Sequence, residues 1–441
     1  MHTKIEKPVL AAGLAVALAV SATACGGHGQ GGGPAGKSGA GPASRLSSSR
    51  GLGNIVVGGR AVTGSEPSGI AKVPYRRTYT DGALYAPVTG YRSMAFYRTG
   101  LEAVYDDVLS AGLKSGGPSG DVVTTIRPGV QKAAFDALGD REGAAVALDT
   151  RTGKLLALVS TPSYDPGTFS GNTLRDETAW KTLIRQKPDP LLNRALRLTA
   201  APGATFHVVV AAAALERGLY TGVDDATKSP LTFALPGTAD TVTGDDPRCE
   251  NATIRTALRY SCANVFARMS LDVGRSALRS TAEKLGFNDE KLLTPLRANE
   301  SAYPTQALSG AQLARTGDGG GGVAATPVEM ARITASLANG GRLVTPRLVD
   351  RVEKADGRTE RPGASGDRSG QAVSRRTAQA LRSVLTATAV RGGDDAGSWL
   401  TTCVRQADGG TVSIAVYVRR SGGDGAQRAE QVAGRIAGAL S

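Results

Sequence analysis

The 441-residue chain is basic, with 52 Lys and Arg against 39 Asp and Glu and a formal net charge of +13. Because 41% of its residues are hydrophobic, it can bury one large or two moderate cores, which excludes a disordered chain. Only 5% are aromatic, and the basic residues are not interleaved with aromatic ones. The composition therefore favours anionic surfaces such as phospholipid or wall polymers, and no nucleic-acid partner is expected.

Residues 1–25 have the pattern of an export signal, in which two lysines precede an apolar run over 9–24. The run is shorter than the roughly 20 residues of a membrane-spanning helix. Three interpretations are open: a lipoprotein acylated at Cys25, a secreted protein cleaved after Ala24, and an uncleaved membrane anchor. We favour acylation, since residues 26–54 form a flexible Gly/Ser-rich tether. All three place the folded part outside the cytoplasm.

Cysteines can pair in that compartment. Cys249 and Cys262 are close enough in sequence to bridge a short loop, which leaves Cys403 over. We expect no metal and no cofactor, because the chain has no Cys-x-x-Cys pair and only one histidine, His207, beyond residue 28. A single histidine also leaves little room for a Ser-His-Asp triad.

The segment 55–120 is predicted to be a small N-terminal module. Residues 53–64 and 72–91 alternate apolar and polar side chains, which predicts short strands. Residues 100–112 have a helical pattern, and residues 113–121 have the composition of a linker.

The remaining segment, 121–441, begins with a predicted strand that is followed by a helix after Pro128. Residues 143–166 contain two apolar runs around a Thr-Gly turn, which predicts a hairpin at the centre of an antiparallel sheet. A run without a polar face follows Gly203 and predicts a buried helix that begins near Ala204.

Six stretches now resemble, in order, the transpeptidase domain of class B penicillin-binding proteins: 120–138, 144–166, 193–218, 253–274, 324–349 and 398–418. The resemblance covers roughly residues 70 to 435. It implies an α/β (α+β) domain of the serine β-lactamase and transpeptidase type, with a central antiparallel sheet and helices, behind a small N-terminal pedestal module.

The family's chemistry is carried by three motifs, SxxK, SxN and KTG. In SxxK, a serine at a helix start lies one turn from a lysine that takes its proton. The corresponding residues here are Ala204-Thr205-Phe206-His207, which lack the serine. His207 shares the face of Ala204, whereas Thr205 is turned about 200° from His207 on an α-helix. His207 is expected to fill the volume of the lysine.

The second motif is also altered. Ser261-Cys262-Ala263 stands in place of Ser-x-Asn, and Asn264 comes one residue late. On a helix this displaces Asn264 by about 100°, so we expect it to be a packing residue.

The third motif has two alignments. Either Leu385-Thr386-Ala387 replaces Lys-Thr-Gly, or the strand is deleted before Trp399. Lys354 is the last lysine, so neither alignment supplies a cation from lysine. A third option, Arg368-Ser369-Gly370, precedes the helix that should come before the motif.

These alterations predict a non-catalytic transpeptidase homologue, tethered to the outer face of a bacterial cell membrane. It would bind cell-wall synthesis proteins or peptidoglycan stem peptides, with Thr205, His207, Ser261 and Asn264 as candidate cleft residues. The alternative is an active D,D-transpeptidase or serine hydrolase whose nucleophile has moved to Ser261 or Thr205, with His207 as the base. A sensor that binds β-lactams without reacting is a weaker third hypothesis.

Overall fold

The computed structural model describes residues 51–363, 370–420 and 424–441. The predicted signal, Cys25 and most of the predicted tether lie outside these ranges. Within the described ranges, no helix combines the length and apolar character needed to cross a bilayer.

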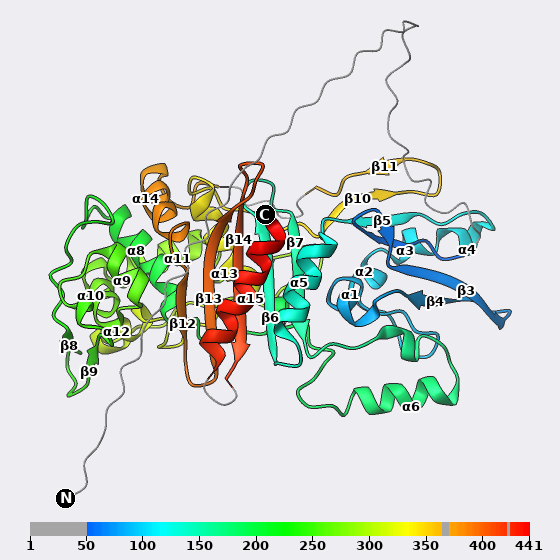
Figure 1. Ribbon diagram of the computed structural model, residues 1–441, viewed down its shortest axis with the longest axis horizontal. Coiled ribbons are helices and arrows are strands. Elements are labelled where there is room, and N and C mark those ends of the chain that lie inside the picture. The colour runs from blue at the N-terminus through cyan, green and yellow to red at the C-terminus, as the bar shows by residue number, and fades with distance from the viewer. Residues whose placement is uncertain (1–50, 364–369, 421–423) are drawn as a thin grey trace, which may run out of the picture. The chain divides into compact units, whose positions relative to one another are not determined.

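The first sheet has the strand order β11-β10-β5-β1-β2 (Figure 1). Its strands are β1 (Ile55–Val57), β2 (Arg60–Ala61), β5 (Asp121–Thr124), β10 (Val349–Glu353) and β11 (Thr359–Glu360). β1 and β5 are parallel, whereas β5 and β10 are antiparallel. Strands from beyond residue 120 therefore complete the sheet that the N-terminal segment begins.

The rest of the N-terminal segment consists of a hairpin and short helices: β3 (Thr63–Ile70), β4 (Val73–Tyr79), α1 (Gly82–Thr89), α2 (Gly100–Val104), α3 (Asp106–Leu109) and α4 (Ala111–Ser115). Two predictions are wrong here. The second half of the predicted strand region 72–91 is α1, because Tyr85 and Val88 pack into the core. The single helix predicted over 100–112 is divided into α2, α3 and the start of α4.

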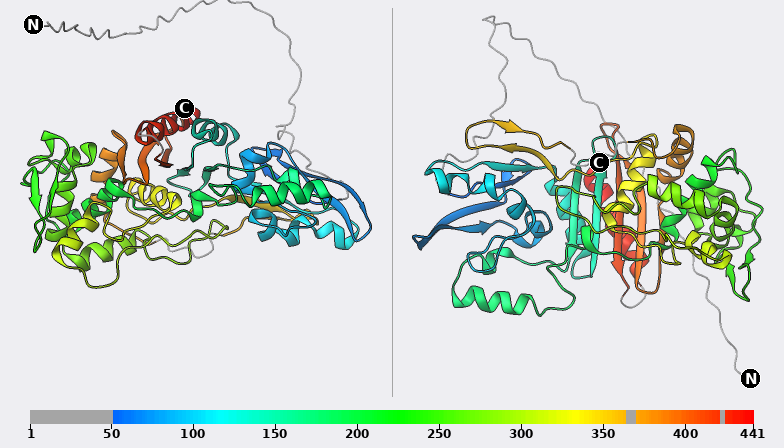
Figure 2. Two further views of the ribbon diagram at one scale, coloured as in Figure 1. Left: turned by 90° about the horizontal axis from the view of Figure 1, so that it is seen from below. Right: turned by 180° about the vertical axis from the view of Figure 1, so that it is seen from behind.

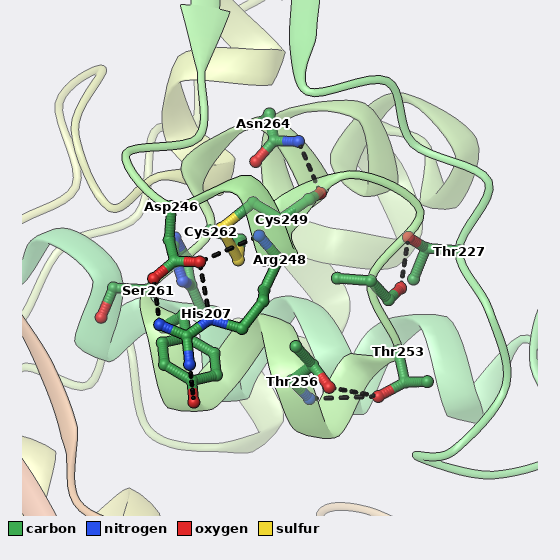
Figure 3. Close-up of a disulfide and its surroundings, with 12 residues drawn as sticks. His207, Thr227, Asp246, Arg248, Cys249, Thr253, Thr256, Ser261, Cys262 and Asn264 are labelled. Atoms are coloured by element: carbon green, nitrogen blue, oxygen red, sulfur yellow. Dashed lines mark hydrogen bonds and ion pairs between the residues drawn. A yellow bond between two sulfur atoms is a disulfide. The ribbon is translucent and has the colours of Figure 1, made fainter.

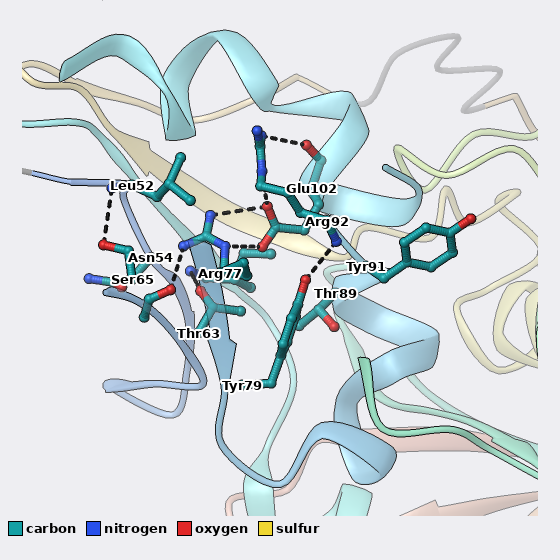
Figure 4. Close-up of polar contacts among 12 residues, drawn as sticks. Leu52, Asn54, Thr63, Ser65, Arg77, Tyr79, Thr89, Tyr91, Arg92 and Glu102 are labelled. Carbon is teal, nitrogen blue, oxygen red and sulfur yellow. Dashed lines mark hydrogen bonds and ion pairs between the residues drawn. The ribbon is translucent and has the colours of Figure 1, made fainter. Parts of the chain in front are cut away.

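A buried ion-pair cluster joins the hairpin to α2 (Figure 4). Glu102 of α2 is fully buried and lies 2.7 Å from Arg77 Nε of β4 and 2.9 Å from Arg92 Nε. Arg92 also pairs with Asp106, and Arg77 Nη1 donates to the Gly53 carbonyl at 2.7 Å. Buried charges are retained only when they are paired and hydrogen-bonded, so this cluster fixes α2 against the hairpin.

The second sheet is antiparallel throughout, with the order β12-β13-β14-β6-β7. Its strands are β6 (Gly143–Asp149), β7 (Leu155–Thr161), β12 (Val390–Gly393), β13 (Gly397–Arg405) and β14 (Thr411–Arg419). The hairpin predicted over 143–166 is confirmed as β6 and β7, because both strands are apolar and buried on both faces.

Helices cover both faces of this sheet (Figures 1 and 2). On one face, α5 (Pro128–Leu138) and α15 (Gly425–Leu440) share a core with alternate residues of the strands, such as Ala145 and Ile414. On the other face, α13 (Pro327–Ala338) packs on β6, β13 and β14 and belongs to the main core. α8 (His207–Glu216) belongs to the same core and packs against other helices. The expected layered α/β architecture with a central antiparallel sheet is present.

The remaining helices and strands surround α8 or extend from the junction between the two sheets. They are α6 (Leu174–Leu183), α7 (Arg194–Arg197), α9 (Ile254–Tyr260), α10 (Ala263–Val273), α11 (Arg275–Lys284), α12 (Gly310–Gly317), α14 (Arg375–Leu385), β8 (Thr232–Ala234) and β9 (Thr241–Thr243). The described ranges also contain the 3₁₀ turns η1 (Pro166–Phe169), η2 (Gly203–Phe206) and η3 (Pro247–Cys249).

Candidate functional site

The segment compared with SxxK begins as a 3₁₀ turn and not as an α-helix. Residues Gly203–Phe206 form η2, and α8 begins three residues later than predicted, at His207. Gly203 has a φ of +52°, a conformation that favours glycine, and it allows the chain to enter the buried helix sharply. Ala204 is 8% exposed and offers only a methyl group at the start of this turn.

Thr205 does not present its hydroxyl to a cleft. The side chain is fully buried, and its Oγ1 donates to the Pro202 carbonyl at 2.7 Å. This local bond is typical of a threonine in the first turn of a helix, where the hydroxyl competes for backbone groups. The bond uses the only proton that a nucleophilic Thr205 would have to lose.

His207 is fully buried and has one polar partner. Its Nε2 lies 3.1 Å from Oδ1 of Asp318, the C-cap residue that follows α12, and its ring stacks on Phe266 with centroids 4.0 Å apart. Its Nδ1 is buried without a hydrogen-bond partner among the described residues. Burial lowers the pKa of His207 and the neighbouring Asp318 opposes this shift, so the ring is neutral near pH 7.

Ser261 follows α9 in the left-handed conformation, with a φ of +53°. Its Oγ donates to the Arg391 carbonyl of β12 at 2.8 Å, across the gap between α9 and the sheet. His207 and Ser261 each have another polar partner, and no hydrogen bond joins them in the described structure. The base–nucleophile pair required by the relocated-enzyme hypothesis is not assembled.

Asn264 belongs to the scaffold beside the disulfide (Figure 3). Cys249 and Cys262 are bonded to each other, a pairing that the sequence left open, and the buried Asn264 Nδ2 donates to the carbonyls of Cys249 and Pro230. Ala263 begins α10 without a polar group. Asn264 therefore holds the loop that enters the disulfide.

Neither alignment of the third motif describes the structure. Leu385 is the buried last residue of α14 and Thr386 is its C-cap, so residues 385–387 are not on a strand. The edge strand is not deleted either: it is β12, paired with β13 in a register that places Gly392 opposite Trp399. Local sequence could have located it, because Arg391-Gly392-Gly393 lies just before the strand of Trp399.

β12 carries a positively charged residue, Arg391, that neither alignment of the third motif included. Arg391 is about half exposed and forms an ion pair with Glu430 of α15. Its side chain is thus directed to the helix layer, whereas its carbonyl accepts the Ser261 hydroxyl. A peptide that extended the sheet would need this outward carbonyl as an acceptor.

The outer edge of β12 is in close contact with η2. A Cβ on Gly392 would lie 2.5 Å from Thr205 N and 2.6 Å from Ala204 N. A Cβ on Gly203 would lie 2.3 Å from Gly393 N. We name this glycine-lined contact the β12–η2 seam. Five cavities in the described part of the chain have linings that do not include Ala204, Ser261 or Gly392.

Comparison with known proteins identifies the family. The penicillin-binding protein transpeptidase domain matches residues 143–415, and the penicillin-binding protein A dimerisation domain matches residues 52–115. The peptidoglycan D,D-transpeptidase PbpA of Mycobacterium tuberculosis is 36% identical over 334 residues, which cover 70% of this chain and 67% of that protein. PbpA of Mycolicibacterium smegmatis is 34% identical over 332 residues, with the same shares covered.

Solved structures agree. The crystal structure of penicillin-binding protein A from M. tuberculosis has a TM-score of 0.77 at 29% identity and covers 89% of this chain and 99% of its own. Its imipenem acyl-enzyme complex has a TM-score of 0.77 at 30% identity, with 88% and 98% covered. The chain therefore belongs to the class B penicillin-binding protein transpeptidase family and is PbpA-like.

Proposed function

We propose that this chain is a non-catalytic transpeptidase homologue that acts by binding, as a scaffolding or regulatory protein of peptidoglycan synthesis. One observation carries the proposal. The helix start that lies against β12 has the methyl group of Ala204 as its first side chain, and the hydroxyls of Thr205 and Ser261 both donate to backbone carbonyls. Neither of these two hydroxyls donates to a base.

The position of His207 supports this proposal. Its Nε2 faces Asp318, and its fully buried ring stacks on Phe266, so proton transfer to a substrate would require it to leave a packed site. Removal of a nucleophile that acts with its base typically costs about a million-fold in rate. We therefore expect neither acyl transfer nor a covalent β-lactam adduct.

The proposed location of the protein in the cell rests on the export signal predicted over residues 1–25. The protein would act at the outer face of the bacterial cell membrane, attached through Cys25 or secreted after cleavage at Ala24. Its partners would be wall-synthesis proteins or peptidoglycan stem peptides. Its net charge of +13 suits anionic wall polymers and phospholipid.

The match to a dimerisation domain over residues 52–115 also supports self-association. Four exposed large apolar side chains lie in this segment: Ile70 at 37%, Val73 at 39%, Tyr97 at 90% and Val104 at 47% exposure. Sedimentation at several concentrations tests this. A concentration-dependent dimer that Tyr97→Ser weakens is expected, and a monomer at all concentrations would refute it.

Turnover of a D-alanyl-D-alanine peptide and of its thioester analogue tests the lack of catalysis. We expect rates equal to the buffer blank for the wild-type protein, Ser261→Ala and Thr205→Val. Turnover in the wild type that either substitution abolishes would establish the relocated nucleophile and refute the proposal.

A further inference from the structure

A cavity of about 550 Å³ lies outside the region of the β12–η2 seam, between α1 and α2 on one side and residues 189–197 on the other. Its size falls within the range of small-molecule sites. It is lined by small and aliphatic side chains, including Ala86, Ala103, Leu196 and Leu296. The site described above uses none of these residues.

The walls of this cavity are held in place by polar contacts across it. Asn193 Nδ2 donates to the Pro87 carbonyl of α1 at 2.8 Å, and Ser163 Oγ donates to the Ala83 carbonyl at 2.6 Å. On the same side as α1, α2 is fixed by the buried Glu102 cluster. The cavity is therefore preformed, and a ligand would not have to order its walls.

Three charged side chains line the cavity: Arg197, Arg297 and Asp189. Arg197 donates only to the Arg297 carbonyl, at 3.4 Å, and neither guanidinium has a carboxylate within ion-pair distance in the described ranges. Asp189 accepts the Leu191 backbone N–H. The cavity thus offers two cations without acidic partners and one carboxylate.

One lining group is unsatisfied. Asn193 Oδ1 is buried without a hydrogen-bond partner, although the amide nitrogen of the same side chain is used. Because this oxygen is fully buried, an occupant of the cavity does not contact it. The charged side chains of the lining therefore set the chemistry of the occupant.

We propose that this cavity binds a short peptide that carries two carboxylates, one amino group and small apolar side chains. The carboxylates pair with Arg197 and Arg297, and the amino group pairs with Asp189. The methyl side chains pack on the aliphatic lining. This inference rests on the proposed function, because a peptidoglycan stem peptide has this chemistry and a binding role does not require turnover.

The test is calorimetric titration of the whole protein with acetyl-L-Ala-γ-D-Glu-L-Lys-D-Ala-D-Ala, which has two carboxylates and one amino group. Arg297→Glu changes an exposed residue and is expected to weaken binding at least about tenfold. Ala103→Trp, at an exposed lining position, is expected to fill the cavity and abolish binding. The D-isoglutamine analogue, which lacks one carboxylate, is also expected to bind about tenfold more weakly.

The matched control is Arg259→Glu, an exposed arginine next to Tyr260 and Ser261 that does not line the cavity. It is expected to bind as the wild type does. The proposal is overturned if the wild type does not bind at millimolar peptide, or if Arg259→Glu weakens binding while Arg297→Glu does not. These binding results test only the proposed peptide site in the cavity. The proposed lack of catalysis is tested independently, by turnover and by acylation.

Discussion

The β12–η2 seam predicts that a single methyl group at Gly392 destabilises the protein. Its Cβ would meet three backbone atoms, Thr205 N at 2.5 Å and Ala204 N and Pro202 O at 2.6 Å. Contacts below 3.0 Å do not occur for real Cβ atoms, and backbone atoms cannot rotate away, so β12 and η2 must separate. Overpacking of this kind costs about 1–3 kcal/mol.

Urea unfolding of Gly392→Ala measures this cost, and hydrogen exchange of the β12 amides reports whether the seam opens. Gly222→Ala is the matched control, because nothing lies within 4 Å of its Cβ and its φ is not in the left-handed range. The control is expected to change stability by less than about 1 kcal/mol. If Gly392→Ala is as stable as the control and its exchange is unchanged, the seam is not closed as described.

Three further predictions concern stability. Glu102→Gln leaves two largely buried arginines without their shared carboxylate, and we expect the free energy of unfolding in urea to fall by about 3–5 kcal/mol. Asp136→Asn, which removes an exposed ion pair, is the control and is expected to cost less than about 1 kcal/mol. Burial lowers the pKa of His207 in the folded protein, so as the pH falls the histidine is protonated in the unfolded chain before it is protonated in the folded one. The free energy of unfolding therefore decreases below about pH 6.5, by at most about 1.4 kcal/mol per pH unit. His207→Gln should remove this slope and leave the biological role intact; lost function at an unchanged melting temperature would show that the side chain acts in the site. Reduction of Cys249–Cys262, 13 residues apart, should cost about 3 kcal/mol, and equal unfolding curves with and without reductant would contradict this.

The sequence predicts the central sheet well because its signals are local. Residues 143–166 contain two apolar runs around a tight turn, and the buried helix after η2 has no polar face. The strands predicted over 72–91 fail at α1, where burial of Tyr85 and Val88 outweighs the local pattern and even a proline is accommodated inside the helix.

The partners of the candidate site residues could not be predicted from local sequence. The partner of His207, Asp318, lies 111 positions away, and the carbonyl that binds Ser261 belongs to Arg391, 130 positions away. Only tertiary packing brings these residues together. The location of β12 could be inferred from its place just before the strand of Trp399, but its two glycines have no apolar alternation, so their role in the close approach to η2 appears only in the structure.

The most direct test of the central claim is intact-protein mass spectrometry after incubation with penicillin G. Penicillin-binding protein A from M. tuberculosis, which has been solved as a penicillin G acyl-enzyme, is the positive control. The account predicts an unchanged mass for this chain while the control is fully labelled. An adduct of one penicillin, mapped to Ser261, Thr205 or another residue, would contradict it.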